Sequence, residues 1–386
     1  MNARLAALSL LFGNFFVGVC VLAPAGMLSQ LAAGLGVTVA QAGLLVTYGA
    51  VVLCIGSPLM SWWTSRMDRR ALLSGILLVM AAGHLASAFA PSYPALLAIR
   101  LLMVAVAAPY TPQAASTAAL LVPERQRASA IAFVFLGWSL SVAVGLPLVN
   151  FLAAHYGWRA SYGVFAGGAA LGALSLIIWL PAGLRGAAVS LKSWAAIAHH
   201  HQIRLILLLT ALQVAGQFAL FTYLSPLLVQ LAGANAGTIG AFFAIFGIMG
   251  VVGNVVATRL ASRYGAFRSS FLFLLSMLAG VAMWTFGAGA IPIMAVGMGL
   301  WGLGFAAMNS MQQARLVAAA PPLASGSVAL NTSAIYVGQA VGSAIGGFFL
   351  AHDRSLTIGY LAVALLIASL LLLMLTRAPG ERMVPA

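Results

Sequence analysis

Residues 5–65, LAALSLLFGNFFVGVCVLAPAGMLSQLAAGLGVTVAQAGLLVTYGAVVLCIGSPLMSWWTS, carry no charged side chain and decide the fold. A helix needs about 20 apolar residues to cross the hydrocarbon of a bilayer, so this stretch has room for two crossings. Residues 34–41, GLGVTVAQ, predict the turn between them. The apolar residues are continuous rather than alternating, which favours helices over the strands of a membrane barrel.

The rest of the chain follows the same pattern, because charged residues mark the ends of its apolar segments. Two more uncharged intervals, 205–258 and 269–314, are long enough for two crossings each, with turns predicted near 233–237 and 287–292. Single crossings fit between the remaining charges, at 71–99, 101–123, 128–158, 160–184, 316–352 and 355–376. The sequence therefore predicts an all-α integral membrane protein with twelve transmembrane helices.

The composition excludes a soluble protein. Apolar residues make up 63% of the chain and charged residues 6%, against about 25% charged in soluble domains. The net charge of +14 reflects basic loops and a shortage of acids, so it indicates contact with anionic lipid rather than nucleic acid. Cys20 and Cys54 both lie in apolar segments and are interpreted as packing residues, not as a disulfide or a metal pair.

The basic residues predict the orientation in the membrane. With the N-terminus in the cytoplasm, all but three of the 18 Lys and Arg residues fall in cytoplasmic segments. The exceptions are Arg159 and Arg354, which lie outside, and Arg100, which lies within a crossing. Both termini are therefore expected in the cytoplasm.

The chain is expected to divide into two halves of six helices. Residues 183–203, GLRGAAVSLKSWAAIAHHHQI, form the longest polar-containing stretch, in which we expect a short interfacial helix. The three histidines at 199–201 fan around such a helix, so they do not suggest a metal site. The predicted organisation is an N-terminal bundle at 1–184, a cytoplasmic linker at 185–203, a C-terminal bundle at 204–378 and a cytoplasmic tail at 379–386.

A short pattern repeats in the loop after the second helix of each half. Gly56 stands nine residues before Ser65, which Arg66 follows, and Gly253 stands nine residues before Ser262, which Arg263 follows. The shared topological position indicates two halves related by a pseudo-two-fold axis along the membrane normal.

Several motifs resemble those of the major facilitator superfamily. The loop at 61–70, SWWTSRMDRR, resembles the family pattern Gly-x-Leu-Ala-Asp-Arg-x-Gly-Arg-Arg, with Ser65 at the usual acidic position and Asp68 at the usual second glycine. Further likenesses are LLAIR ending at Arg100, GLP at 145–147 followed by GWR at 157–159, FTYLSP at 221–226 and ALNTS at 329–333. The last two strings are similar to the bacterial drug:proton antiporter group and its arabinose and sugar efflux permeases.

The resemblance implies a secondary transporter that works by alternating access in the bacterial inner membrane and needs no cofactor. It implies that the first, fourth, seventh and tenth helices line a central cavity, and that protons are the coupling ion. A monomer suffices for this architecture.

Glycines and loop charges are the candidates for conformational change. Gly338, Gly342 and Gly346 recur every four residues on the eleventh helix, and the fifth helix shows the same spacing from Gly137 to Gly145. Small residues let helices approach closely, for either static packing or sliding. The predicted gating set is Gly56, Arg66, Asp68, Arg69, Arg70, Gly145, Pro147, Arg263, Gly338 and Gly342.

The acids are informative because none lies within a predicted crossing. Asp68, Glu124, Asp353 and Glu381 all fall in loops or the tail. Intramembrane carboxylates are the usual proton relays and the usual partners of cationic drugs. Lipophilic cations are therefore not expected as preferred substrates, and no carboxylate is available as a proton carrier.

Two intramembrane residues could carry charge. Arg100 serves either as a hydrogen-bond hub between helices or as a counter-charge for substrate. His84, in the third predicted helix, is expected to bond to a neighbouring helix rather than to carry protons.

Uncharged polar residues form the predicted binding site. Amides facing lipid are costly, so most of them should face inward. As a set, amides and tyrosines suit hydroxyls and neutral polar groups, although each one alone fits an interhelical hydrogen bond equally well. The predicted substrate-binding residues are Asn14, Tyr48, Arg100, Tyr110, Gln113, Gln213, Gln217, Tyr223, Asn309, Gln312, Asn331 and Gln339.

These patterns favour an exporter of neutral or weakly anionic small molecules, either sugars or drug-like compounds, with protons as the candidate exchange ion. Two alternatives stay open: an organic-anion carrier that uses Arg100 as counter-charge, and a membrane sensor that does not transport. No helix shows a His-Glu-x-x-His motif or an intramembrane acid for a catalytic triad, so an enzyme is not expected.

Overall fold

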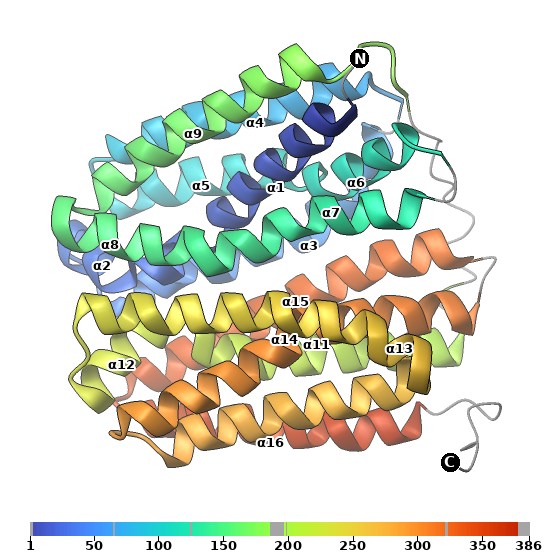
Figure 1. Ribbon diagram of the computed structural model, residues 1–386. Coiled ribbons are helices and arrows are strands. Elements are labelled where there is room, and N and C mark those ends of the chain that lie inside the picture. The colour runs from blue at the N-terminus through green and yellow to red at the C-terminus, as the bar shows by residue number, and fades with distance from the viewer. Residues whose placement is uncertain are drawn as a thin grey trace. The chain divides into compact units, whose positions relative to one another are not determined.

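The computed structural model describes residues 3–64, 66–123, 126–185, 197, 199–320 and 323–376. Every regular element within these ranges is a helix (Figure 1). Twelve helical segments are long and apolar enough to cross a membrane, which confirms the predicted number. The interfacial helix predicted within 185–203 and the tail predicted at 379–386 lie largely or wholly outside the described residues.

The crossings follow the chain in order. The first six are α1 (Ala3–Gly26), α3 (Val39–Trp63), α4 (Arg69–Ala88), α5 and α6 together (Tyr93–Ala107 and Tyr110–Leu120), α7, η2 and α8 together (Arg127–Leu140, Ser141–Gly145 and Leu146–Tyr156), and α9 (Trp158–Trp179). The last six are α11 (His201–Phe221), the two parts of α13 (Ala236–Phe286), α14 (Ile291–Ala319), α15 (Ala324–Ala351) and α16 (Ser355–Leu375). Two short helices, α2 (Leu28–Leu35) and α12 (Leu224–Ala232), were not predicted.

Local chemistry explains where the helices end. Gly36 closes α2 in the left-handed conformation, and Thr38 then starts α3 with a capping box, its side chain accepting from the N–H of Gln41. Gly233 closes α12 in the same left-handed way. Gly265, at a φ of 79°, divides α13 into its two crossings. The turns predicted from the sequence therefore form where glycine allows a positive φ.

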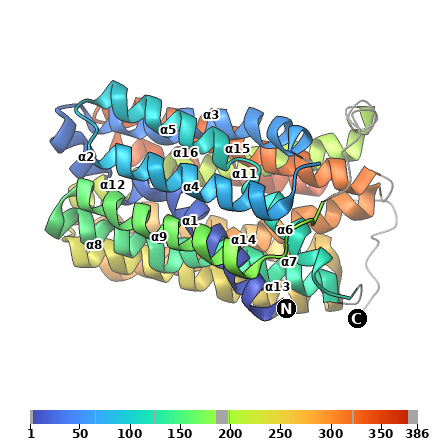
Figure 2. The same cartoon turned by 90° about the horizontal axis from the view of Figure 1, so that it is seen from above.

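The chain forms two compact units. The first comprises Met1–Val189 with Thr222–Gly247, and the second comprises Ser190–Phe221 with Ile248–Ala386. In the first unit α4 packs along α9, and α1 packs along α7 (Figures 1 and 2). In the second unit α11 packs between α15 and α16.

The segment 222–247 is held to the first unit by specific contacts. The amide of Asn150 in α8 donates to the carbonyl oxygen of Ala236 at 2.7 Å. The ring and hydroxyl of Tyr223 cover Gly43 in α3, where a Cβ would come within 2.2 Å of the hydroxyl oxygen. Only glycine at position 43 leaves room for this contact.

Candidate functional site

Arg100 holds three helices of the first unit together. From α5 its guanidinium donates to the carbonyl oxygens of Cys20 and Val21 in α1 and of Leu45 in α3, each at 2.8 Å. In a helix the carbonyl of Cys20 would accept from the N–H of residue 24, but Pro24 has none. Arg100 supplies the donor that Pro24 removes. This geometry is that of a hydrogen-bond hub between helices.

Two other predicted residues of the first unit bond across helices. Asn14 in α1 donates to the carbonyl of Val134 in α7 at 2.9 Å and accepts from the hydroxyl of Thr111 in α6 at 2.7 Å. Gln113 in α6 donates to the hydroxyl of Thr64, at the end of α3, at 3.4 Å. Asn14 is fully buried, so both of its bonds form away from bulk solvent.

The predicted tyrosines lie in different surroundings. Tyr48 is 44% exposed, whereas Tyr110 and Tyr223 are fully buried. The hydroxyl of Tyr110 lies against Gly13 and has no hydrogen-bond partner among the described residues. These residues of the first unit therefore do not form one continuous polar patch.

In the second unit the predicted amides come from α11, α14 and α15, which pack on one another. Three of them, Gln217, Gln312 and Asn331, bond to neighbouring side chains. Gln217 accepts from the indole N–H of Trp301 at 3.1 Å, and Gln312 accepts from Arg315 at 3.0 Å. Arg315 also donates to Thr376, at the end of α16.

Four amides of the second unit keep unpaired buried atoms. Neither side-chain atom of Gln213 has a partner within the described residues, and the same is true of Oδ1 of Asn309, Nδ2 of Asn331 and Nε2 of Gln339. The other amide atom of Asn331 accepts from Thr210 at 2.8 Å. A buried polar atom without a partner costs about 1–3 kcal/mol. The second unit therefore offers free donors and acceptors that a ligand or water could satisfy.

His84 does not form the hydrogen bond predicted for it. It is fully buried in α4, and neither ring nitrogen has a partner among the described residues. Its ring packs instead against that of Tyr162 in α9, with centroids 5.8 Å apart. The prediction was wrong because helix α9 presents an aromatic ring there, and the hydroxyl of Tyr162 has no partner in the described part of the chain either. No group of three metal-ligating side chains occurs within the described ranges.

The loop between α3 and α4 is hydrogen-bonded to the segment that follows α9. The carboxylate of Asp68 caps α4 by accepting from the N–H of Ala71 at 2.9 Å, and it also accepts from the N–H of Gly183. The N–H of Arg69 donates to the carbonyl of Leu184 at 2.9 Å. The bonds from Ala71 and then Gly183 hold the pKa of Asp68 below its ordinary value of 3.8, against the opposing effect of burial.

The remaining charges of the gating set lie at helix ends. Arg66 is exposed, Arg70 is half-buried, and the guanidinium of the exposed Arg263 stacks on the ring of Tyr264 at 5.2 Å. Ser65, which occupies the family's acidic position, lies outside the described residues.

Glycines of the gating set lie at close helix contacts. A Cβ on Gly338 would meet the carbonyl oxygen of Ala211 in α11 at 2.3 Å, and one on Gly342 would meet that of Ala215 at 2.2 Å. In the first unit, Gly145 faces Val19 of α1, with a Cβ at 2.5 Å from its methyl group. Gly56 has more room, since the nearest atom to a Cβ is at 3.4 Å.

Pro147 follows a wide helical turn. It stands at the start of α8, directly after the π-helix η2 (Ser141–Gly145). Because Pro147 has no N–H for the carbonyl of Ala143, the α-helical bond between them is missing and the helix widens there.

The sequence matches the Major Facilitator Superfamily over residues 10–329. The chain belongs to this superfamily. An inner membrane transport protein, YdhP, of Escherichia coli (strain K12) is 31% identical over 355 residues, covering 90% of this chain and 89% of that protein. An uncharacterized MFS-type transporter, YtbD, of Bacillus subtilis (strain 168) is 30% identical over 357 residues, covering 89% of this chain and 87% of that one.

Solved structures of the superfamily share the fold. The nucleoside transporter NupG aligns with a TM-score of 0.81 at 12% identity, covering 98% of this chain and 100% of that chain. The xylose transporter XylE from E. coli, in a partially occluded inward-open conformation, aligns with a TM-score of 0.74 at 14% identity, covering 99% and 98%. The major facilitator chain is thus a secondary transporter of small molecules by alternating access, a multi-pass inner-membrane protein and not an enzyme.

Sequence reasoning missed the partners of the predicted residues. Trp301, Thr111 and Thr210 complete bonds to Gln217, Asn14 and Asn331. One signal was available for Trp301, because a buried indole N–H needs an acceptor. Another was Pro24, since a proline within a membrane helix leaves a carbonyl for a neighbouring helix to satisfy.

Proposed function

We propose that this transporter exports neutral or weakly anionic small molecules, sugars or drug-like compounds, in exchange for protons. The observation that carries the substrate class is the set of unpaired amide atoms on α11, α14 and α15. An amide offers donors and acceptors together, which match hydroxyl and carbonyl groups of neutral solutes.

Arg100 supports the neutral class over an organic-anion carrier. Three of its N–H groups are directed at carbonyl oxygens of α1 and α3. Recruiting the guanidinium for an anionic substrate would break all three bonds and would leave the buried carbonyl of Cys20, which faces Pro24, without a donor, at about 1–3 kcal/mol.

The absence of acids from the crossings argues against lipophilic cations, because these are usually held by intramembrane carboxylates. Two transporters of the same fold are named for a nucleoside and for xylose, both neutral and rich in hydrogen-bonding groups. The fold therefore accommodates such solutes.

Export and proton exchange rest on the likeness to the drug:proton antiporter group. The proposed organisation has six-helix bundles at 1–184 and 204–378, a linker at 185–203 and both termini in the cytoplasm, although contacts group the segment 222–247 with the first compact unit. Cysteine accessibility at the two termini, measured in intact cells, tests the orientation.

The substrate class is tested by thermal unfolding of the purified protein with arabinose, uridine, chloramphenicol, benzoate and tetraphenylphosphonium. A ligand at about 100 times its dissociation constant adds roughly 2.7 kcal/mol to the stability of the folded state. We expect a neutral compound to stabilise the protein and the cation to have no effect.

Gln213→Met makes the test specific, because methionine keeps the length of the side chain and removes its unpaired atoms. The ligand-free variant should be as stable as the wild type or more stable, by up to about 1–3 kcal/mol, and should lose the response to the neutral ligand. Leu209→Met, one turn earlier on α11, is the matched control and should keep that response. Stabilisation by benzoate alone, unchanged in Gln213→Met, would refute the proposed class.

Export is tested with the same ligand, radiolabelled, in inside-out vesicles. Uptake into the vesicles should require an inward-acidic pH gradient and should stop when nigericin collapses it. Uptake that is indifferent to the gradient would contradict proton exchange while leaving the substrate class intact.

A further inference from the structure

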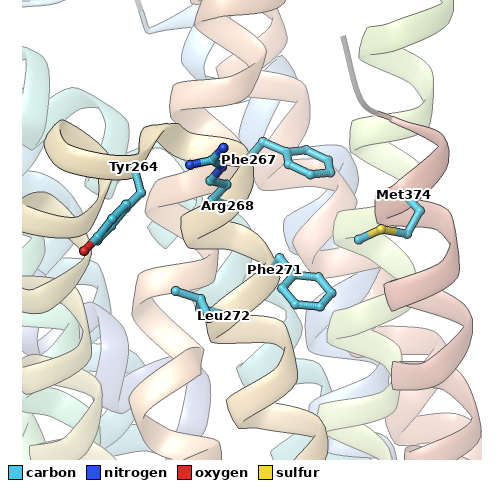
Figure 3. A pocket seen from close by; sticks show the side chains of 6 residues that line it. All are labelled: Tyr264, Phe267, Arg268, Phe271, Leu272 and Met374. Atoms are coloured by element: carbon cyan, nitrogen blue, oxygen red, sulfur yellow. The ribbon is translucent and has the colours of Figure 1, made fainter. Parts of the chain in front are cut away.

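A groove in the second unit lies at one end of the helices that form it. Its lining is Tyr264, Phe267, Arg268, Phe271, Leu272 and Met374, and its volume is about 400 Å³ (Figure 3). That volume falls within the about 300–1,000 Å³ typical of ligand sites. Four of these residues, Phe267, Arg268, Phe271 and Leu272, follow Gly265 within about one turn and a half of the second part of α13, so they lie on one side of that helix, whereas Tyr264 precedes the break at Gly265.

The groove lies where the crossings end. Arg268 is three residues beyond Gly265, at which α13 changes direction, and Met374 is the penultimate residue of α16. The two helices pack on each other farther along, where Gly359 of α16 lies against Thr285. A tyrosine and an arginine at the end of a crossing are typical of the border between hydrocarbon and water.

The walls of the groove are apolar, whereas its rim, the part that carries Arg268, is positively charged. Figure 3 shows Phe267 and Phe271 one turn apart, both directed toward Met374, with the guanidinium of Arg268 between Phe267 and Tyr264. The accessible lining is almost entirely apolar. An apolar groove does not hold ordered water, so in a bilayer a hydrocarbon chain is its natural occupant.

The charge at the rim has no acidic partner among the residues that the structure describes. Arg268 is half-buried and has no hydrogen-bond or ion-pair partner among the described residues. Asp353, the single acid in the described part of the second unit, lies before the opposite end of α16. That helix has 21 residues, so the separation along it is roughly 30 Å. Arg263, stacked on Tyr264, adds a second positive charge nearby.

We propose that this groove binds one anionic glycerophospholipid, with an acyl chain between Phe267, Phe271 and Met374 and the phosphodiester at Arg268. A guanidinium binds phosphate in a fork of two hydrogen bonds, and it does so more strongly away from bulk water. By the predicted orientation the lipid belongs to the cytoplasmic leaflet. The inference is independent of the transported substrate, because no residue of the groove belongs to the predicted binding set.

The test uses delipidated protein in detergent, titrated with phosphatidylglycerol or phosphatidylcholine of identical acyl chains, with native mass spectrometry as the readout. The wild type should hold one phosphatidylglycerol about five-fold more tightly than phosphatidylcholine. Arg268→Gln should remove that preference. Arg204→Gln is the matched control, since it deletes an exposed positive charge at the start of α11 in the same unit, and it should bind as the wild type does.

The acyl-chain pocket is tested separately. Met374→Trp should fill the groove and lower the occupancy of both lipids while Arg268 stays in place. If this variant does not fold, as judged by circular dichroism and gel filtration, Leu272→Trp takes its part, because Leu272 is 46% exposed.

Three results would overturn the proposal. Equal losses in Arg204→Gln and Arg268→Gln would mean a general effect of net charge. Equal affinity of the wild type for both lipids would remove the role of Arg268. Displacement of the lipid by soluble glycerol 3-phosphate at the same concentration would indicate a phosphate site rather than a lipid groove.

Discussion

Replacing Arg100 by methionine should destabilise the first unit, and the size of the effect follows from its three bonds. The guanidinium joins α5 to the carbonyls of Cys20, Val21 and Leu45 at 2.8 Å. Measured interhelical hydrogen bonds in membrane proteins average about 0.6 kcal/mol and reach about 1.7 kcal/mol. Three such bonds amount to about 2–5 kcal/mol of unfolding free energy.

The three carbonyls are not equivalent once Arg100 is gone. Those of Val21 and Leu45 still have a backbone N–H four residues on, whereas that of Cys20 faces Pro24. Pro24→Ala restores the missing donor. The cost of Arg100→Met should therefore be about 1 kcal/mol smaller in the Pro24→Ala background, which a double-mutant cycle reports as a coupling energy.

The assay is equilibrium unfolding of the purified variants in mixed micelles of dodecyl maltoside and sodium dodecyl sulfate, followed by circular dichroism. Arg159→Met is the control, because Arg159 makes one carbonyl bond, to Ala90 at 3.1 Å, and stacks on the ring of Trp158 at 4.1 Å, so its loss should cost only about 1–1.5 kcal/mol. A coupling energy of zero between positions 24 and 100, or wild-type stability of Arg100→Met, would refute the reasoning.

Two further substitutions test the hydrogen bonds of Asp68 to Ala71 and Gly183 and the contact between α11 and α15. Asp68→Ala should lower stability by about 1 kcal/mol at neutral pH, as loss of a helix cap does. The pKa of Asp68 is lower in the folded state than in the unfolded state. The stabilisation that Asp68 provides is therefore present above about pH 4 and is lost as the pH falls through the folded-state pKa. Melting curves of the variant and the wild type should converge in acid and stay apart at pH 7. Gly342→Ala places a Cβ at 2.2 Å from the carbonyl oxygen of Ala215 and should lower the free energy of unfolding by about 1–3 kcal/mol. Gly163→Ala is the control, because nothing lies within 4 Å of a Cβ there, and it should raise the melting temperature. Equal effects of the two substitutions would contradict the packing argument.

The crossings were predictable because their signal is local. Charges at their ends locate most turns, and the three turns predicted inside uncharged intervals contain glycines with positive φ, at 36, 233 and 289. The short helices and the wide turn within uncharged stretches were not predictable in this way. The short helices α2 and α12 and the π-turn η2 lie inside apolar runs, where the spacing of charges carries no information.

The binding residues were predictable as a class but not one by one. Asn14 and Gln213 have the same chemistry and the same burial. Yet Asn14 is paired with Thr111, 97 residues away, whereas the side chain of Gln213 has no partner among the residues that the structure describes. A sequence shows which side chains need a partner within the membrane. Which of them find one depends on contacts between helices that no spacing along the chain records.

The unpaired amides of the second unit predict an order of substrates. In the first unit Arg100 and Asn14 bond to protein atoms, so they gain nothing from a ligand, and the buried atoms without a partner among the described residues there include those of His84 and the hydroxyl of Tyr110. Water that satisfies the unpaired amides of the second unit must be displaced when substrate enters, and only groups that replace its hydrogen bonds avoid a loss of affinity. A polyhydroxylated neutral solute can replace them one by one, an organic anion supplies acceptors but no donors, and an apolar cation supplies neither. In the wild type, affinity should therefore be highest for a polyhydroxylated neutral solute, lower for an organic anion and lowest for an apolar cation. In Gln213→Met the three affinities should be similar.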